Sequence, residues 1–479
     1  MEMIVAGLKS ASSDGKRITV RNPATGEIVD SVPAATAEDV SAAVKAAREG
    51  FLTWSQIPLY ERARTFIRFA QLAESKRGEL GSIICGEMGK TIRESEGEVS
   101  SIINLFTGYA EKAKHLYGIT MPRTAEERTE TDLILTMREP LGVVACIIPF
   151  NYPVDLFSHK VAPALIMGNA VIVKPSSSNP LACIRLVEML HECGVPGSAA
   201  QILTGPGEVL GELLAGNPGI NAVSFTGSTR VGIQIAKRAA ENMTRVFLEC
   251  GGNDPFIVFG DADLDLAVEE MVGARASNAG QTCCASKRII IENSAKDVFA
   301  KKLAVRLSKL KTGNPAERAT ELGCLISEKA AAKVEEQVAL TMGQGATCIL
   351  GGKRHGSFFP PTILTDVTAQ MDIAKDMEVF GPVFPIIGFD SEAEAVRIAN
   401  SSQYGLQAGV MSANTYRAMR VASLLQCGGV IVNGASQYRS AEMPFGGYKK
   451  SGTGREGISC TLEEMSQVKT IVLKRVLAP

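Results

Sequence analysis

The most constraining feature of this chain is a regular alternation of short apolar runs and longer helical runs that begins near residue 141. Runs such as GVVACIIP and AVIVKPS are almost continuously apolar, as in parallel strands that are buried on both faces of a sheet. Strands that alternate with helices predict an α/β fold with a doubly wound parallel sheet. In order, the expected strands and helices are GVVACIIP, 161–167, AVIVKPS, 181–193, AAQILTG, 208–215, AVSFTGS, 231–240 and RVFLECGG.

A second series of strand-like runs predicts a second α/β unit of about 180 residues. Its strands are RIIIEN, ATCILGG, PTILTDV, VFPIIGFD and GGVIVNG, with helices expected at 296–310, 327–344, 392–400 and 414–426. Residues 36–118 instead repeat apolar residues at helical spacing, and Thr36 is the expected cap of the first helix. Two distant segments, 129–138 and 466–474, alternate like exposed strands. Because unpaired strand edges invite association, we expect them to pair with each other and with another subunit of a homodimer or homotetramer.

Charge and apolar content exclude several classes of function. The chain has 479 residues, and 50 Lys+Arg against 51 Asp+Glu leave a net charge of −1. Dispersed basic residues and a neutral balance give no reason to expect a nucleic-acid partner or an acidic membrane surface. The most apolar runs are about ten residues long, too short to span a bilayer. The N-terminal residues do not resemble a signal peptide, so we expect a soluble, cytoplasmic protein.

The eleven cysteines form no CxxC pair, so we expect neither a metal site nor a disulfide framework. Most are expected to be reduced core residues. Cys283 and Cys284 stand side by side in GQTCCAS, directly after a Gly-Gln turn. Adjacent cysteines cannot bridge each other without strain. From the residues alone, both belong to the core or one of them is a nucleophile.

Several residues follow the expected strands of the first sheet, where a doubly wound sheet binds its ligands. Lys174 ends one strand, and Gly205 and Gly207 follow another. Gly227 and Ser228 form a turn that opens a helix, where free backbone amides favour phosphate. Each turn alone is weak support for a nucleotide site, because glycine-rich turns are common and neither a GxGxxG motif nor a P-loop is present.

Two more strand ends carry residues suited to acyl chemistry. Asn151 lies between two prolines in PFNYP, where the stiff turn can present its side-chain amide rigidly. Glu249 ends the run RVFLE, either as a solvated strand end or as a carboxylate in a cleft. A thiol, a carboxylate and an amide are the nucleophile, base and oxyanion donor of an acyl-type site.

Over essentially its full length, the chain resembles the aldehyde dehydrogenase superfamily. The matching motifs, in the family's order, are PFNYP, IVKPSS, SFTGSTRVG, LECGGNDP, NAGQTCCAS, EVFGPV and PFGGYKKSGTGRE. The resemblance implies a dinucleotide-binding domain (1–120 and 141–251), a catalytic domain (252–452) and a small β oligomerisation element (121–140 and 453–479).

The resemblance also implies a role for each matching residue. Cys283 is the expected nucleophile, Glu249 the general base and Asn151 the oxyanion donor. An aldehyde would bind covalently to the Cys283 sulfur, lose a hydride to the nicotinamide, and leave as a carboxylic acid after hydrolysis of the thioester. The expected cofactor contacts are Lys174, Ser177, Gly205, Gly227, Ser228, Glu378 and Phe380.

Departures from the family pattern bear on both substrates. Ser177 stands where NAD-selective relatives often have Glu, so NADP, or dual use of NADP and NAD, is expected, unless Ser177 only caps the next helix. The expected aldehyde pocket offers few large aromatics, which favours a small polar aldehyde with an anionic group. Its candidate contacts are His159, Thr282 and Arg439. The alternatives are a dehydrogenase that transfers its acyl group to coenzyme A and a non-catalytic binding or structural protein on the same fold.

Overall fold

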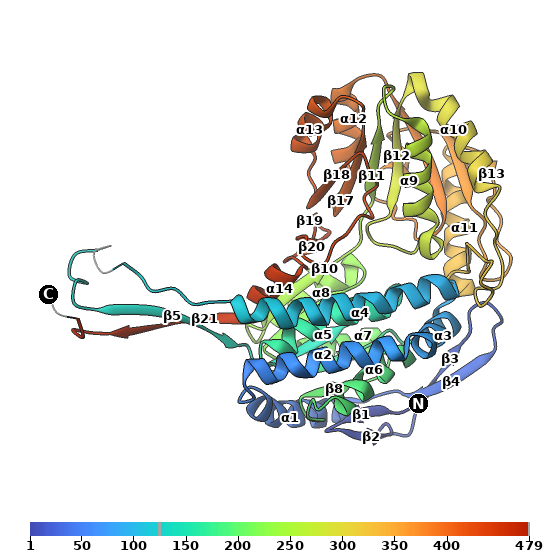
Figure 1. The fold of residues 1–479 in the computed structure, drawn as a ribbon. Helices are drawn as coiled ribbons and strands as arrows, with labels where there is room; N and C mark the ends of the chain where they lie inside the picture. Colours follow the sequence, from blue (N-terminus) through green and yellow to red (C-terminus); the bar gives the residue numbers. More distant parts are fainter. Residues whose placement is uncertain (123–125, 478–479) are drawn as a thin grey trace.

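The computed structural model describes residues 1–122 and 126–477 and contains two large sheets (Figure 1). The order across the first sheet is β2 (Leu8–Ser10), β1 (Met3–Val5), β8 (Ala200–Ile202), β7 (Ala170–Lys174), β6 (Val143–Ile147), β9 (Ala222–Thr226), β10 (Arg245–Glu249) and β20 (Gly452–Thr453). The five strands from β8 to β10 are parallel, as the sequence predicted. The antiparallel edge strands β1, β2 and β20 were not anticipated.

Alternate residues of β6 face two different cores, which explains its continuous apolar sequence. Val144 and Cys146 pack into one buried cluster, and Val143, Ala145 and Ile147 pack into another on the opposite face. Helices cover both faces, so the sheet is doubly wound. The helices are α1 (Ala37–Trp54), α2 (Leu59–Ser75), α3 (Arg77–Met88), α4 (Ile92–Lys112), α5 (Pro153–Ile166), α6 (Leu181–Glu192), α7 (Gly207–Ala215) and α8 (Thr229–Ala240).

The predicted helical region 36–118 contains four α-helices and the short 3₁₀ helix η1 (Ala113–His115). Thr36 caps α1 as predicted: its side chain accepts from the Asp39 amide, and the Asp39 side chain accepts in return. Thr91 and Glu94 form the same capping box at α4. α4 is thereby fixed at the end that carries Glu94 and Glu98.

The second sheet has the order β13 (Thr347–Leu350), β14 (Thr362–Val367), β15 (Val383–Phe389), β12 (Ser286–Glu292), β11 (Asp254–Val258), β17 (Gln407–Met411) and β18 (Gly429–Val432). The two strands β11 and β17 lie inside this sheet but were not predicted. The helices of this part are α9 (Leu264–Ala276), α10 (Asn293–Leu307), α11 (Glu328–Gly343), α12 (Glu392–Asn400) and α13 (Thr415–Leu424), with the 3₁₀ helices η2 (Ser277–Gly280) and η3 (Asp372–Ala374).

The remaining strands are β3 (Arg17–Arg21) and β4 (Ile28–Pro33), which form a hairpin, and the short pair β16 (Tyr404–Gly405) and β19 (Tyr448–Lys449). α14 (Ile458–Glu464) packs against α4 and α5. No helix within the described ranges combines the length and the apolar character that a bilayer crossing requires.

The two distant exposed segments pair, as the sequence predicted. β5 (Leu133–Pro140) and β21 (Ser466–Leu473) form an antiparallel ladder along all eight residues of each strand. This arm projects from the body of the molecule (Figure 1). Residues 123–125 and 478–479 of the predicted oligomerisation element lie outside the described residues. The domain boundaries and a subunit partner for the arm stay predictions.

Candidate active site

Two cavities meet where the first sheet ends. The larger, here named the strand-end cleft, has a volume of about 680 Å³ and is lined by residues that follow β6, β7, β9 and β10. The smaller, here named the small cavity, has about 410 Å³ and lies between α4, α5 and the loops around 282–284 and 437–441. Among the described residues, Asn151 and Cys283 are the two that line both. The cavities therefore meet at the predicted nucleophile and oxyanion donor.

A strained turn presents Cys283. Asn278 and Ala279 both have φ of 50°, and the amide of Asn278 donates to the Glu94 carboxylate at 2.7 Å. Gly280 is required next, because a Cβ there would lie 2.3 Å from the Gly381 carbonyl oxygen. The hydrogen bond with Cys284 and burial raise the pKa of the Cys283 thiol well above its usual range. At neutral pH the resting nucleophile is the thiol.

The predicted rigidity of the PFNYP turn has a clear structural origin. The Asn151 carbonyl accepts from the Asn278 side chain at 2.9 Å, which links this turn to the loop that carries Cys283, here named the nucleophile loop. Glu98 accepts from the Val154 amide at 2.8 Å, at the start of α5. The buried Lys90 ammonium lies 2.5 Å from Glu98. The backbone of the turn that carries Asn151 is therefore held against the loop that carries Cys283, and Asn151 lines both cavities.

Glu249 ends β10, as predicted, but its carboxyl group is buried away from both cavities. In the described part of the chain it lines neither of them, and its Oε2 has no hydrogen-bond partner. A Cβ on Gly446 would lie 2.9 Å from its Oε1. Burial and the nearby Glu456 carboxylate raise the pKa of Glu249 well above its usual range. The buried site therefore favours the protonated form of Glu249 relative to an exposed carboxyl group.

Behind Glu249 lies a buried ionic cluster that the sequence patterns did not reveal. Lys160 Nζ lies 2.9 Å from Glu456 Oε1, and Arg439 Nη2 donates to Glu456 Oε2 at 2.7 Å. Although burial opposes ionisation, the Lys160 and Arg439 cations lower the pKa of Glu456. In the sequence, Lys160 could have been singled out as a lysine within the largely apolar run that forms the buried helix α5.

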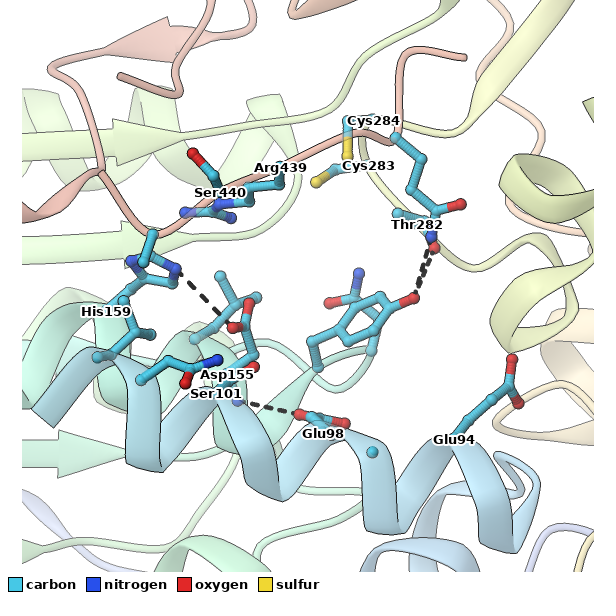
Figure 2. A pocket seen from close by; sticks show the side chains of 18 residues that line it. Glu94, Glu98, Ser101, Asp155, His159, Thr282, Cys283, Cys284, Arg439 and Ser440 are labelled. Atoms are coloured by element: carbon cyan, nitrogen blue, oxygen red, sulfur yellow. Dashed lines mark hydrogen bonds and ion pairs between the residues drawn. The ribbon is translucent and has the colours of Figure 1, made fainter. Parts of the chain in front are cut away.

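Figure 2 shows the small cavity, where the predicted substrate contacts His159, Thr282 and Arg439 lie. Glu94, Glu98 and Ser101 rise from α4 and face Cys283, Arg439 and Ser440. His159 lies at one end, with Nε2 3.8 Å from Asp155. Burial and the Arg439 charge lower the pKa of His159 to about 4. His159 is thus neutral at pH 7 and offers a hydrogen bond in place of the predicted charge.

Arg439 and Thr282 line the same small cavity. Arg439 lies with its guanidinium carbon 4.2 Å from the centre of the Phe445 ring. Its Nε and Nδ1 of His159 have no hydrogen-bond partner within the described residues. Thr282 Oγ1 lies 3.3 Å from the Tyr152 hydroxyl. In the described structure, Arg439 Nε and His159 Nδ1 are thus buried, unpaired polar atoms of residues that line this cavity.

The strand-end cleft fits a dinucleotide. Ser228 begins α8 without a side-chain cap, so the helix presents free amides, as predicted. The buried Thr226 Oγ1 lines the cleft and has no hydrogen-bond partner among residues 1–122 and 126–477. Gly227 also lines the cleft. Burial lowers the pKa of Lys174, in the same cleft, to about 8. Free amides, an unpaired hydroxyl and a cation suit the phosphates and ribose of a nucleotide.

The other predicted cofactor residues surround this cleft. Ser177 lines it, but its hydroxyl donates to the Gly205 carbonyl at 2.8 Å and does not cap α6. Gly205 itself is not a lining residue. Glu378 and Phe380 line the opposite side, where the Phe380 ring lies 5.8 Å from the Phe150 ring. In the described ranges no group of three or more His, Cys, Asp or Glu side chains is arranged to hold a metal ion.

Comparison with known proteins identifies the family. A model of the aldehyde dehydrogenase family matches residues 10–471. The chain is 39% identical over 475 residues to a 3-sulfolactaldehyde dehydrogenase from Pseudomonas putida, which covers 98% of this chain and 96% of that relative. It is 37% identical over 462 residues to the NADP(+) succinate-semialdehyde dehydrogenase of Escherichia coli strain K12, with 96% and 94% covered.

Comparison with solved structures identifies the same family. The structure matches a betaine aldehyde dehydrogenase from Staphylococcus aureus in complex with NAD+ at a TM-score of 0.95 and 36% identity, covering 99% of this chain and 95% of that chain. As the ordered motifs predicted, the chain belongs to the aldehyde dehydrogenase family.

Proposed function

We propose that this chain, an NAD(P)-dependent aldehyde dehydrogenase by its family, oxidises a small polar aldehyde with an anionic group to the carboxylic acid. The observation that carries the proposal is that Cys283 and Asn151 line both the small cavity and the strand-end cleft. A carbon bonded to the Cys283 sulfur would thus lie between an aldehyde pocket and a nucleotide cleft.

The Cys283 sulfur bonds to the aldehyde carbon as the thiolate; because its pKa is raised, the resting thiol must first give its proton to water. The side-chain amide of Asn151 and the backbone N–H of Cys283 stabilise the oxygen anion that forms. A nicotinamide cofactor held in the strand-end cleft, with Glu378 and Phe380 among its contacts, would supply the hydride acceptor for that carbon. Glu249 is assigned the activation of the water that hydrolyses the thioester, which requires its buried side chain to turn toward Cys283 and to lose its proton against a raised pKa. Hydrolysis is therefore favoured toward alkaline pH.

The anionic substrate is supported by Arg439. In the described part of the chain, Arg439 is the one cationic side chain that lines the small cavity at neutral pH, since His159 is neutral there. Three carboxylates also line this cavity: Glu98 binds Lys90, Glu94 accepts from the Asn278 amide, and Asp155 lies 3.8 Å from His159 Nε2. Arg439 pairs with the buried Glu456 through Nη2, so its Nε and Nη1 are the groups that would face an anionic substrate. Two of the relatives described above are named for a semialdehyde and a sulfolactaldehyde, whose second functional group is a carboxylate or a sulfonate, whereas the third is named for betaine aldehyde.

An aldehyde panel tests this proposal. Succinate semialdehyde, glutarate semialdehyde and 3-sulfolactaldehyde are compared with uncharged butanal by the absorbance of the reduced cofactor. We expect kcat/KM to be at least about tenfold higher for an anionic aldehyde, and Arg439→Gln to remove that advantage while it changes butanal oxidation little. Equal kcat/KM across the panel would reject the anionic substrate and leave the dehydrogenase assignment intact.

The cofactor preference is expected to favour NADP or to be dual. Lys174 and Ser177 line the cleft, and neither adds a carboxylate that would repel a 2′-phosphate. A kcat/KM ratio of NADP over NAD below about 0.01, a gap of about 2.7 kcal/mol, would reject this preference.

The alternative acceptor is coenzyme A. An acylating enzyme has no use for a base that activates water, so the buried carboxyl of Glu249 beside the nucleophile loop favours hydrolysis. Product analysis with and without coenzyme A separates the two reactions, because only the acylating enzyme yields a thioester of coenzyme A. Absence of any turnover with either cofactor would instead favour a non-catalytic binding protein.

A further inference from the structure

Lys287 is a buried cation next to Cys283, and the proposed reaction gives it no role. Its side chain is 1% exposed, and in the described structure it lines neither cavity. Its ammonium donates to the backbone carbonyl of Cys283 and lies 3.3 Å from Glu378 Oε1. The same ammonium lies 5.8 Å from the centre of the Phe380 ring. Lys287 therefore contacts Cys283 and lies near Glu378 and Phe380, which both line the strand-end cleft.

The two oxygens of Glu378 have different environments. Oε1 accepts from the Gly252 amide at 3.1 Å and pairs with Lys287. Oε2 faces the chain at Gly251, where an added Cβ would lie 2.3 Å from it. Glu378 is 21% exposed and lines the strand-end cleft. Lys287 and Gly252 thus hold one oxygen and leave the carboxylate able to receive a ligand in the cleft.

A buried ammonium is costly unless a carboxylate and further acceptors compensate it. Asp254 is the other carboxyl group close to Lys287, but burial raises the pKa of Asp254 well above its usual range. Glu378 is then the anionic partner of Lys287. In the Lys287–Glu378 pair, the lysine is buried and the glutamate is partly open to the strand-end cleft. The position of Lys287 therefore affects any ligand that binds Glu378.

We propose that Lys287 is a positioning residue that ties the Cys283 peptide to Glu378, and so fixes the spacing between the nucleophile and the nicotinamide end of the cofactor. The inference rests on the proposed function and on the family resemblance, which implies that Glu378 receives the nicotinamide ribose. Lys287 acts through Glu378 and has no contact of its own with the cofactor.

The experiment compares cofactor affinity with the affinity for a fragment that ends before Glu378. Dissociation constants are measured for NADP+ and 2′,5′-ADP, and for NAD+ and AMP, in the wild type and in Lys287→Met. We expect the dinucleotide that binds the wild type to weaken about tenfold in Lys287→Met, and its fragment to change less than about twofold. Equal weakening of dinucleotide and fragment, or no change in either, would overturn the proposal.

Matched variants control for folding and charge. Lys302→Gln removes an exposed cation that pairs with Asp265 on the far surface, and it should change neither constant. Lys287→Gln keeps a donor for the Cys283 carbonyl but removes the charge, and it carries the test where Lys287→Met does not fold. A wild type that binds no dinucleotide would refute the proposed function itself, whereas wild-type binding unaffected by either Lys287 variant would refute only this link.

A double-variant cycle tests whether Lys287 acts through Glu378. In a Glu378→Gln background, Lys287→Met should weaken the dinucleotide by less than about twofold, because the partner that it positions is already altered. A loss of the same size as in the wild-type background would show that the two residues act independently, and the proposal would fail.

Discussion

Asn151 lies in a turn of the first sheet, and Cys283 lies in a loop of the second sheet. A hydrogen bond from the Asn278 side chain to the Asn151 carbonyl joins this turn to this loop. The two side chains border the same junction of cavities. The position of the oxyanion donor relative to the sulfur is therefore set by a buried backbone contact, and a bound substrate is not needed to set it.

Replacement of the nucleophile should abolish turnover. Cys283→Ala is expected to lower kcat by at least about 10³-fold, because the neighbouring Cys284 thiol lines the small cavity but not the strand-end cleft. Cys284→Ala is the matched control and should retain turnover within about fivefold. Steady-state production of reduced cofactor measures both, and comparable losses in the two variants would contradict the assignment of Cys283.

Loss of the oxyanion donor should lower kcat without affecting cofactor affinity. Asn151→Ala keeps the backbone carbonyl that accepts from Asn278 but removes the side-chain amide, so kcat should fall about 10²- to 10³-fold. Asn104→Ala, which alters an exposed residue of the same cavity, should change KM more than kcat. If the Asn151 variant weakened only cofactor binding, its role would be structural.

Replacement of Glu249 should slow the step that follows hydride transfer. Glu249→Gln is expected to keep a burst of reduced cofactor equal to the site concentration, while steady turnover falls about 10²- to 10⁴-fold. Rapid-mixing measurements separate the two phases. Loss of the burst together with steady turnover would count against a role in hydrolysis.

The same variant has an expected effect on stability. The pKa of Glu249 is raised above its ordinary value of 4.5, so the native state holds a proton that the unfolded chain releases above that pH. Wild-type stability from this group is therefore full below pH 4.5 and is lost as pH rises toward the raised pKa. Thermal melting of Glu249→Gln should gain on the wild type with rising pH, whereas Glu336→Gln, an exposed control, should not.

The affinity for NADP+ should depend on the charge of Lys174. Burial lowers the pKa of Lys174 to about 8, so the free protein loses this cation as pH rises through that value. The dissociation constant for NADP+ should increase between about pH 7 and about pH 9.5, with a smaller change for NAD+. Lys174→Met should bind NADP+ more weakly and with little pH dependence, and an unchanged profile in this variant would exclude Lys174 as the titrating group.

The sequence predicted most of the first sheet because its central strands are continuously apolar and are separated by clear helices. β11 was missed because Asp254 and Pro255 are poor strand residues, and the pairing with β12 shifts between them. β17 contains Gly409, where a Cβ would lie 2.7 Å from the Phe256 ring, so a residue of low strand propensity is needed for packing. Tertiary contact decided both cases.

The ordered motifs predicted Cys283, Glu249 and Asn151 as candidates, and the structure brings Cys283 and Asn151 to one junction. They did not predict the raised pKa of Glu249 or the neutral state of His159, because both follow from burial among charged neighbours. The contact between Lys160 and Glu456 joins residues 296 positions apart, which no local pattern can reveal.

The strand that ends in Glu249 is bordered by β20, whose residues Gly452 and Thr453 pair with Glu249 and Leu248. Every other strand of the first sheet precedes residue 250 in the chain. During synthesis on the ribosome, β10 thus remains an open edge until residue 453 has emerged. A polypeptide that stops before residue 452 would leave the edge of β10 beside Glu249 without its partner strand.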